Sequence, residues 1–174
     1  MPGLLHDLNL MTFRTFLTFH TFIPALFRYN LHHSIRRKIM TFEELKQFTK
    51  QTGWGYLATT DGKNVGVRPM GGLAWKDNQL LCATYTPSDK VKQLEKVPYA
   101  EYCFCDSAGK HVRIAGPCLI STDNDEKLWL YKQKPELAQY FPDPKMPEYV
   151  IIKMTPDNLR AMSSTDMTYE QIRI

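Results

Sequence analysis

The sequence lacks the long apolar runs and paired metal ligands that mark several large protein classes. No stretch approaches the roughly 20 consecutive apolar residues that a membrane-spanning helix requires, so we expect no membrane partner. Four cysteines occur, and neither their spacing nor any histidine cluster beside them is typical of a zinc site. We therefore expect no metal, and we interpret the thiols of Cys82, Cys103, Cys105 and Cys118 as reduced core groups of a cytoplasmic protein.

An overall basic field is also absent from most of the chain. The formal net charge is +4, but residues 1–39 carry five Lys or Arg and one acid, which accounts for all of it. The remaining 135 residues hold 17 basic and 17 acidic side chains. Because nucleic-acid binding relies on a basic surface, this balance argues against a nucleic-acid partner.

Residues 1–39 differ in kind from the rest, and we interpret them as an N-terminal extension. They contain five of the nine Phe and four of the five His residues. Four Phe, from Phe13 to Phe22, recur at three-residue steps, which is compatible with a short helix that Pro24 interrupts. Three interpretations stay open: an upstream extension that is not native, with Met40 as the natural start; a helix that binds a membrane or a partner; and a transit peptide.

Residues 40–174 have the pattern of one compact, mainly β domain. Thr41 and Glu44 form a capping box for a helix that ends near Gly53. Short β-type runs separated by turns follow. We expect strands at residues 54–60, 65–70, 73–75, 79–83, 100–106, 111–121, 149–154 and 158–162, and helices at 88–95 and before Tyr140. Most connections are short and antiparallel, and closing such a sheet into a barrel removes its exposed edges.

Three motifs in this domain carry groups that bind phosphate: Val67–Met70, Thr84 and Ser88–Lys90. Arg68 lies near the end of one strand, Thr84 ends another, and Lys90 opens the following helix. Arginine offers a planar fork of donors, lysine adds a point charge, and hydroxyls and the free N–H groups of a first helical turn add further donors. If the strands are neighbours, these groups form a phosphate site without a glycine-rich loop. Taken singly, each is an ordinary surface or capping residue.

A longer sequence pattern surrounds these phosphate-binding groups. It begins with a Gly-x-Leu-Ala-Thr strand at residues 55–59, continues through Arg68-Pro69-Met70, and places Ser88 and Lys90 four and six residues after Thr84. Gln93-Leu94, Val97-Pro98 and Val112–Gly116 extend it. The stretch from Trp54 to about Ser121 resembles the pyridoxamine-5'-phosphate-oxidase-like family. This resemblance implies a six-stranded antiparallel split β-barrel with flanking helices that binds FMN.

The resemblance also implies roles for individual residues. The FMN phosphate would be held by Arg68, Ser88 and Lys90. The ribityl chain and ring would lie, largely against backbone groups, along Pro69, Met70, Ala83 and Thr84. His111 falls where related enzymes have a Gln that reaches the flavin from the second subunit; an exposed strand histidine is the alternative. Asp89 stands where the family often has Arg, and we predict that it points to solvent, because an acid directed inward would repel the phosphate.

A two-fold homodimer with the cofactor at the subunit interface, acting on a small-molecule substrate, is a further implication of the resemblance. A small barrel cannot easily enclose both a flavin ring and a substrate, so a symmetric partner would close the site. Three aromatic residues are candidates for the subunit-contacting face: Tyr102, Phe104 and Trp129. The alternative is that these side chains belong to the core.

The pattern is specific for fold and flavin but not for a reaction. The flavin would supply the redox chemistry, and we expect an FMN-dependent oxidoreductase or flavin reductase, with a non-catalytic or stress-related flavin-binding module as an alternative. Vitamin B6 oxidation is disfavoured, because the chain lacks the C-terminal Trp and Arg-x-His-like stretch of true pyridoxamine-phosphate oxidases. A haem relative would have His111 as its one candidate axial ligand. Cys103 and Cys105 share a strand face about 6–7 Å apart, too far for an unstrained disulfide, which disfavours a redox pair.

Overall fold

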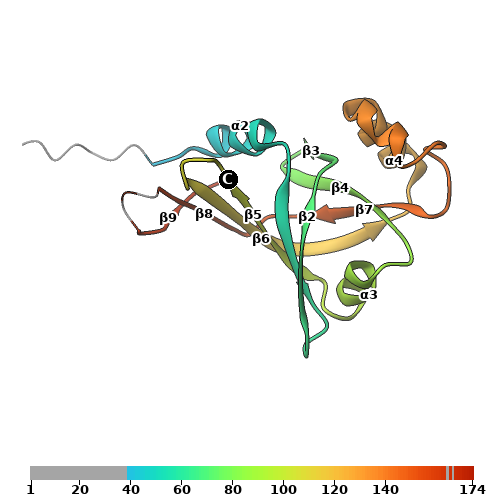
Figure 1. Cartoon of the computed structure of the whole chain (residues 1–174), viewed down its shortest axis with the longest axis horizontal. Helices are drawn as coiled ribbons and strands as arrows, with labels where there is room; N and C mark the ends of the chain where they lie inside the picture. Colours follow the sequence, from blue (N-terminus) through green and yellow to red (C-terminus); the bar gives the residue numbers. More distant parts are fainter. Residues whose placement is uncertain (1–38, 164, 166) are drawn as a thin grey trace, which may run out of the picture. The chain divides into compact units, whose positions relative to one another are not determined.

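The computed structural model describes residues 39–163, 165 and 167–174 (Figure 1). The predicted N-terminal extension lies outside these residues except for Ile39, and it stays a prediction. Within the described part of the chain, no helix combines the length and apolar character needed to cross a bilayer. The same residues contain no group of three or more His, Cys, Asp or Glu side chains arranged to hold a metal ion.

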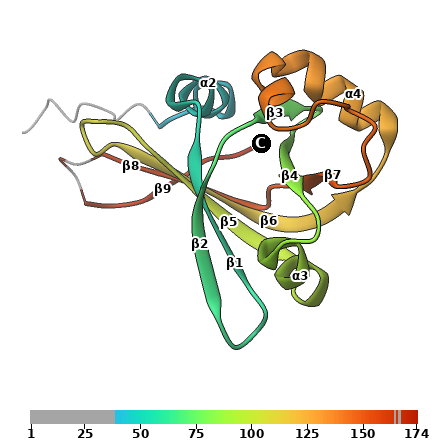
Figure 2. The ribbon, with the colours of Figure 1, turned by 45° about the vertical axis from the view of Figure 1, so that its right-hand side comes forward.

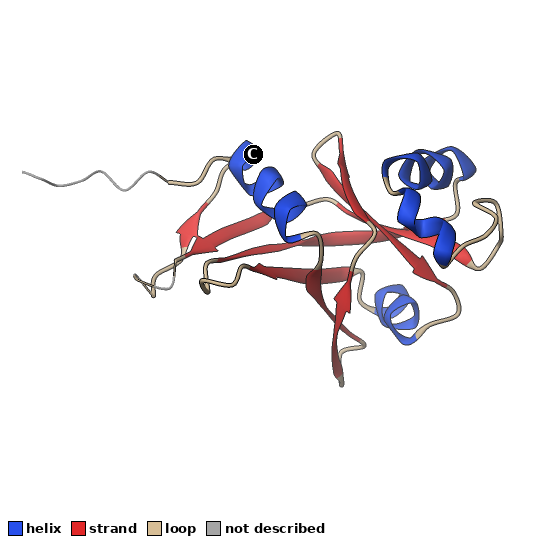
Figure 3. Cartoon of the chain, turned by 45° about the horizontal axis from the view of Figure 1, so that its top comes forward, coloured by secondary structure: helices blue, strands red, loops and turns tan. Residues whose placement is uncertain are grey.

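One curled antiparallel sheet organises the domain (Figure 3). Its nine described strands are β1 (Gly55–Thr60), β2 (Val65–Met70), β3 (Leu73–Lys76), β4 (Gln79–Tyr85), β5 (Tyr99–Cys105), β6 (His111–Ser121), β7 (Tyr149–Met154), β8 (Asn158–Met162) and β9 (Glu170–Gln171). They pair in the order β2-β1-β5-β6-β7-β4-β3, while β8 pairs with β6 and β9 with β8. The antiparallel split-barrel class is confirmed, with nine described strands where the family resemblance implied six; β9 is the only described strand outside the eight ranges predicted from sequence.

The long strand β6 belongs to both halves of the barrel. Residues 111–115 pair with β5 and with β8, whereas residues 118–121 pair with β7. The connection between β7 and β8 therefore passes beside β6 at Gly116. It is fixed there by two backbone hydrogen bonds, from the N–H of Thr155 to Pro117 O at 2.9 Å and from the N–H of Asp157 to Ala115 O at 3.0 Å.

The helix α2 (Phe42–Thr52) begins and ends as the sequence predicts. Its capping box is formed: the Glu44 N–H donates to the Thr41 hydroxyl, and the Thr41 N–H donates to the Glu44 carboxylate at 2.9 Å. Gly53 closes the helix with φ of 72°, a left-handed conformation that glycine adopts without strain. The apolar face of α2 buries Leu45 and Phe48 in the barrel core.

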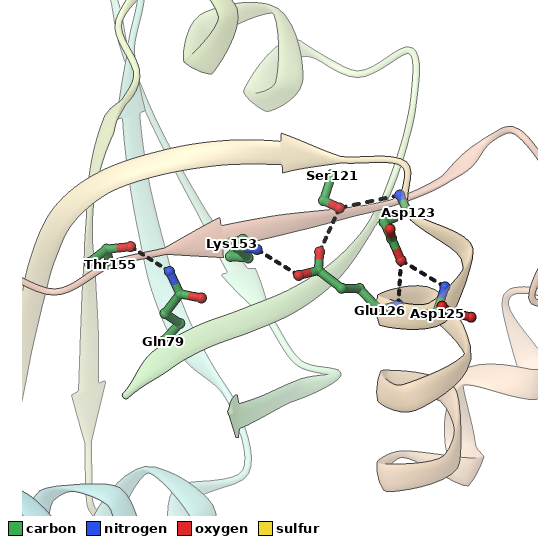
Figure 4. A network of polar contacts seen from close by, with 7 residues as sticks. All are labelled: Gln79, Ser121, Asp123, Asp125, Glu126, Lys153 and Thr155. Carbon is green, nitrogen blue, oxygen red and sulfur yellow. Dashed lines mark hydrogen bonds and ion pairs between the residues drawn. The ribbon is translucent and has the colours of Figure 1, made fainter. Parts of the chain in front are cut away.

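Three further helical segments are α3 (Asp89–Lys96), α4 (Asn124–Gln133) and the 3-10 helix η1 (Pro135–Gln139). Asp123 caps α4 by accepting hydrogen bonds from two backbone N–H groups. Figure 4 shows how the Glu126 carboxylate then joins α4 to the sheet, accepting from Ser121 of β6 and from Lys153 of β7, each at 2.6 Å. This network, together with an apolar cluster that includes Leu130, holds α4 against β4 and β7.

The two faces of β5 differ from the sequence-based expectation. Tyr102 and Phe104 point into the barrel and are fully buried, so their proposed place on a subunit-contacting face was wrong. Trp129 lies on α4 and is partly buried against an apolar cluster. Because side chains alternate along a strand, Cys103 and Cys105 point outward; of the four thiols predicted to be core groups, the structure buries only Cys82 and Cys118.

Candidate functional site

Arg68 and Lys90 come from different elements and lie close enough for their charges to interact. Arg68 is on β2, and Lys90 is in the first turn of α3, which follows β4 and packs against β1 and β6 (Figure 2). Burial lowers the pKa of the Lys90 ammonium, and the positive charge of Arg68 lowers this pKa further. Burial also lowers the pKa of Arg68. Among the described residues, neither cation has a carboxylate within ion-pair distance.

The guanidinium of Arg68 is fixed by groups on β1 and α3. Its Nη1 donates to the Thr59 hydroxyl at 2.6 Å and to Leu57 O at 3.3 Å. Its Nη2 donates to Gln93 Oε1 at 3.3 Å, and the Thr59 hydroxyl donates to the same oxygen. Antiparallel pairing places Leu57 directly opposite Arg68, which explains why β1 supplies two of these acceptors.

Ser88 precedes α3 and has a buried hydroxyl group. It occupies the N-cap position, yet its side chain makes no capping hydrogen bond, and its Oγ has no partner among the described residues. Leaving such a group unpaired costs roughly 1–3 kcal/mol. The free N–H groups of the first helical turn lie at the same place. Asp89 is exposed, as predicted, and its charge partly offsets the burial effects on Arg68 and Lys90.

A groove of about 400 Å³ is lined in part by Lys90, whereas Arg68 and Ser88 are not among its lining residues. Five of the eight predicted cofactor residues line it: Pro69, Met70, Ala83, Thr84 and Lys90. The opposite wall comes from η1 and the residues after it, which include Leu137, Tyr140 and Phe141. The Tyr85 hydroxyl donates to Tyr140 O and so ties this wall to the end of β4. The end of β2, just after Arg68, and the end of β4, just before Ser88, therefore line the same groove.

A glycine makes the close approach of η1 possible. Gly72 has φ of 63°, and a Cβ at this position would lie 2.8 Å from Leu137 Cδ2. The η1 wall was absent from the sequence-based set of site residues, because it lies more than 40 residues after Lys90 in sequence and no motif marks it. Thr59 and Gln93 were also without a predicted role, although both belong to the pattern that carries the family resemblance.

His111 does not line this groove. It opens β6, opposite Cys105, and β5 extends from there for about 20 Å toward α3 at a rise of about 3.3 Å per residue. Its Nε2 lies 3.0 Å from the Tyr169 hydroxyl, and its Nδ1 lies 3.2 Å from Gly109 O. A contact between His111 and a cofactor thus requires a second subunit, and it stays a prediction.

Solved structures with a similar fold come from several bacteria. A NimC/NimA family protein from Clostridium acetobutylicum has a TM-score of 0.65 and 20% identity, over 74% of this chain and 90% of that one. General Stress Protein 26 from Bacillus anthracis has a TM-score of 0.59 and 21% identity, over 73% and 98%. A pyridoxamine 5'-phosphate oxidase-related, FMN binding protein from Nostoc punctiforme has a TM-score of 0.56 and 16% identity, over 75% and 87%. These likenesses show the fold.

The sequence matches no curated protein, but it does match a protein family. The family model described as pyridoxamine 5'-phosphate oxidase matches residues 41–163, most of the chain. The matched range contains β1 to β8 and every residue that lines the groove. The chain therefore belongs to the pyridoxamine 5'-phosphate oxidase family.

Proposed function

We propose that this chain is a flavoprotein that binds FMN, with the phosphate between Arg68 and Lys90. The observation that carries the proposal is the pair of partly buried cations without a carboxylate partner in the described residues, beside the unpartnered hydroxyl of Ser88. A phosphate dianion would neutralise both charges and accept hydrogen bonds from Ser88 and the first-turn amides. The shared fold of the FMN binding protein from Nostoc punctiforme supports flavin as the phosphorylated group.

The groove offers space for the rest of the cofactor. Its volume of about 400 Å³ lies within the range of roughly 300–1,000 Å³ that is usual for small-molecule sites. Pro69, Met70, Ala83 and Thr84 would line the ribityl chain and ring. Bound flavin supplies the redox chemistry, and this chain's residues would bind it, orient it and shield it from water. We infer an oxidoreductase that acts on a small molecule.

A stress-related flavin-binding module with little turnover is the second candidate. The similarity to General Stress Protein 26 favours it. The lining of the groove is consistent with either candidate, because its one carboxylate, Glu136, is ion-paired with Lys134 at 3.8 Å. Haem binding is disfavoured, because both nitrogens of His111 are close to groups of its own chain, away from the groove.

Absorption spectroscopy of the purified protein tests the proposed cofactor. We expect the two bands of oxidised flavin, in the near-ultraviolet and the blue, and release of FMN rather than riboflavin on denaturation. Protein purified without pigment is expected to regain the bands when FMN is added. An intense single Soret band, or no binding of added FMN, would contradict the proposal. Bleaching by NADH or NADPH, followed by reoxidation, would separate the oxidoreductase from the module with little turnover.

We further propose a homodimer that forms through the outer face of β1 and β2. Trp54 and Tyr56 are about half exposed there and their rings contact each other, and Val65 and Val67 are 73% and 63% exposed on the neighbouring strand. Exposed apolar side chains that gather on one face indicate a protein contact. His111 lies on the outward face of the same sheet, opposite Cys105, which supports its predicted reach toward a second subunit.

A charge on this outer face should weaken the proposed dimer. Val67→Glu is expected to raise the dimer dissociation constant at least about tenfold, roughly 1.4 kcal/mol, because an apolar contact would then bury an unpaired carboxylate. Sedimentation velocity over a concentration series measures the change. Lys63→Gln, in the exposed turn before β2, is the matched control, because it changes the net charge by the same −1. A wild-type chain that sediments as a monomer at every concentration would overturn the homodimer.

A further inference from the structure

The side chain of Arg68 is held in one direction by neutral groups. All its acceptors among the described residues are uncharged: the Thr59 hydroxyl, Leu57 O and Gln93 Oε1. These three contacts use both N–H groups of Nη1 and one of Nη2, since a guanidinium has five donors. The N–H of Nε and the second N–H of Nη2 therefore have no acceptor in the part of the chain that the structure describes. Uncharged acceptors orient the cation without neutralising it, so its full charge is available to an anion.

Gly66 provides the space in which the guanidinium lies. Gly66 precedes Arg68 by two residues on β2, so both face the same side of the sheet. A Cβ at position 66 would lie 2.1 Å from Arg68 Nη2 and 3.2 Å from Gln93 Oε1. Its backbone does not have a positive φ and thus does not itself require glycine. A side chain is excluded at position 66 because the guanidinium of Arg68 folds across the strand there.

Gln93 links the Arg68 side chain to α3, the helix that carries Lys90. It lies three residues after Lys90 on α3, which places the two side chains on the same helix face. Its Oε1 accepts from both Arg68 and Thr59, and its amide nitrogen has no hydrogen-bond partner among the described residues. A glutamate would accept the same two hydrogen bonds, but it would neutralise Arg68 and add a negative charge beside the proposed phosphate.

We propose that Gly66, Thr59 and Gln93 are positioning residues that direct Arg68 toward α3 and so make the site select FMN over riboflavin. This inference rests on the proposed function. A guanidinium that is already oriented loses less conformational entropy when it binds an anion, which favours the ligand that carries the phosphate. Riboflavin has the same ring and ribityl chain but no phosphate. Its affinity is therefore insensitive to the direction of Arg68.

Gly66→Ala tests the positioning role through the ratio of the two flavin affinities. The clash involves the end of a flexible side chain, so the variant is expected to fold with Arg68 displaced. We expect FMN affinity to fall about tenfold, about 1.4 kcal/mol, while riboflavin affinity changes less than about twofold. In an Arg68→Ala background, Gly66→Ala should change FMN affinity less than about twofold, because the effect acts through Arg68. Titration of the cofactor-free chains by flavin fluorescence gives all the affinities.

Gln93→Leu provides a second, independent test, because it removes the hydrogen bonds that Arg68 and Thr59 donate to position 93 and leaves the net charge unchanged. We expect weaker FMN binding with riboflavin affinity and melting temperature retained, whereas a merely structural role would leave FMN binding intact. Equal loss of both flavins in Gly66→Ala, or wild-type FMN affinity in both variants, would overturn the positioning role and leave the proposed function standing. A wild-type chain that does not bind FMN would overturn both.

Discussion

Arg68→Ala should weaken FMN binding by roughly 10- to 150-fold, which corresponds to the loss of about 1.5–3 kcal/mol for a charge-assisted hydrogen bond. The Nε–H and one Nη2–H of Arg68 have no acceptor among residues 39–163, 165 and 167–174, and Lys90 supplies the second positive charge of the site. Removing the guanidinium leaves a phosphate dianion with one cationic partner. Fluorescence titration with FMN and with riboflavin measures the effect, and riboflavin affinity is expected to stay unchanged.

Lys92→Ala is the matched control for the loss of one positive charge near Arg68. Lys92 lies on α3, two residues after Lys90, and is exposed to solvent. A long-range effect of net charge would weaken FMN binding in both variants and would diminish at high salt. A direct contact weakens it only in Arg68→Ala. If Arg68→Ala keeps the wild-type affinity, Arg68 does not contact the phosphate and the site has to be sought elsewhere in the groove.

The elements of the site could be predicted from sequence because each is set by local signals. The capping box of Thr41 and Glu44 fixes the start of α2, and the end of β4 followed by a helix start fixes the place of Lys90. Turn residues between β1 and β2 fix the hairpin that carries Arg68. Once β2 and the start of α3 are placed, the proximity of Arg68 and Lys90 follows from the positions of these two elements.

The direction of side chains on β5 is only weakly marked in the sequence. Glu101 is the one charged side chain of the strand and shares a face with Cys103 and Cys105, whereas Tyr102 and Phe104 lie on the other face. Pairing with β1 and β6 decides this direction, through contacts far away in sequence. The same limit applies to the η1 wall and to the guanidinium folded over Gly66, since both depend on packing between distant segments.

Two glycines of this chain exclude a side chain for opposite physical reasons. At Gly66 the obstacle is the flexible end of Arg68, so an added methyl group displaces a side chain and affects the proposed ligand site. At Gly116 the obstacle is backbone: a Cβ there would lie 2.2 Å from Thr155 O and 2.9 Å from Pro156 Cα. The first substitution should change binding, and the second should change stability.

Gly116→Ala is expected to lower the free energy of unfolding by about 2–3 kcal/mol, the upper part of the usual range of about 1–3 kcal/mol for overpacking a filled interior. To make room, the β7–β8 connection has to move away from β6, which weakens the hydrogen bonds from Thr155 N to Pro117 O and from Asp157 N to Ala115 O. The strand β6 pairs in both halves of the barrel, so a shift beside it disturbs both. Urea denaturation, read by tryptophan fluorescence, should show a midpoint lower by roughly 1 M.

Gly71→Ala is the control for this prediction, because it adds the same methyl group where there is space. The nearest atom to a Cβ at position 71 is Trp54 Cβ at 4.0 Å, and Gly71 does not have a positive φ. Its stability should stay within about 0.5 kcal/mol of wild type or rise slightly, since alanine reduces the freedom of the unfolded chain. If Gly116→Ala and Gly71→Ala unfold at the same urea concentration, the β7–β8 connection at Thr155 moves aside without lowering the free energy of unfolding. The two halves of the barrel would then be joined less tightly than the close contact at Gly116 requires.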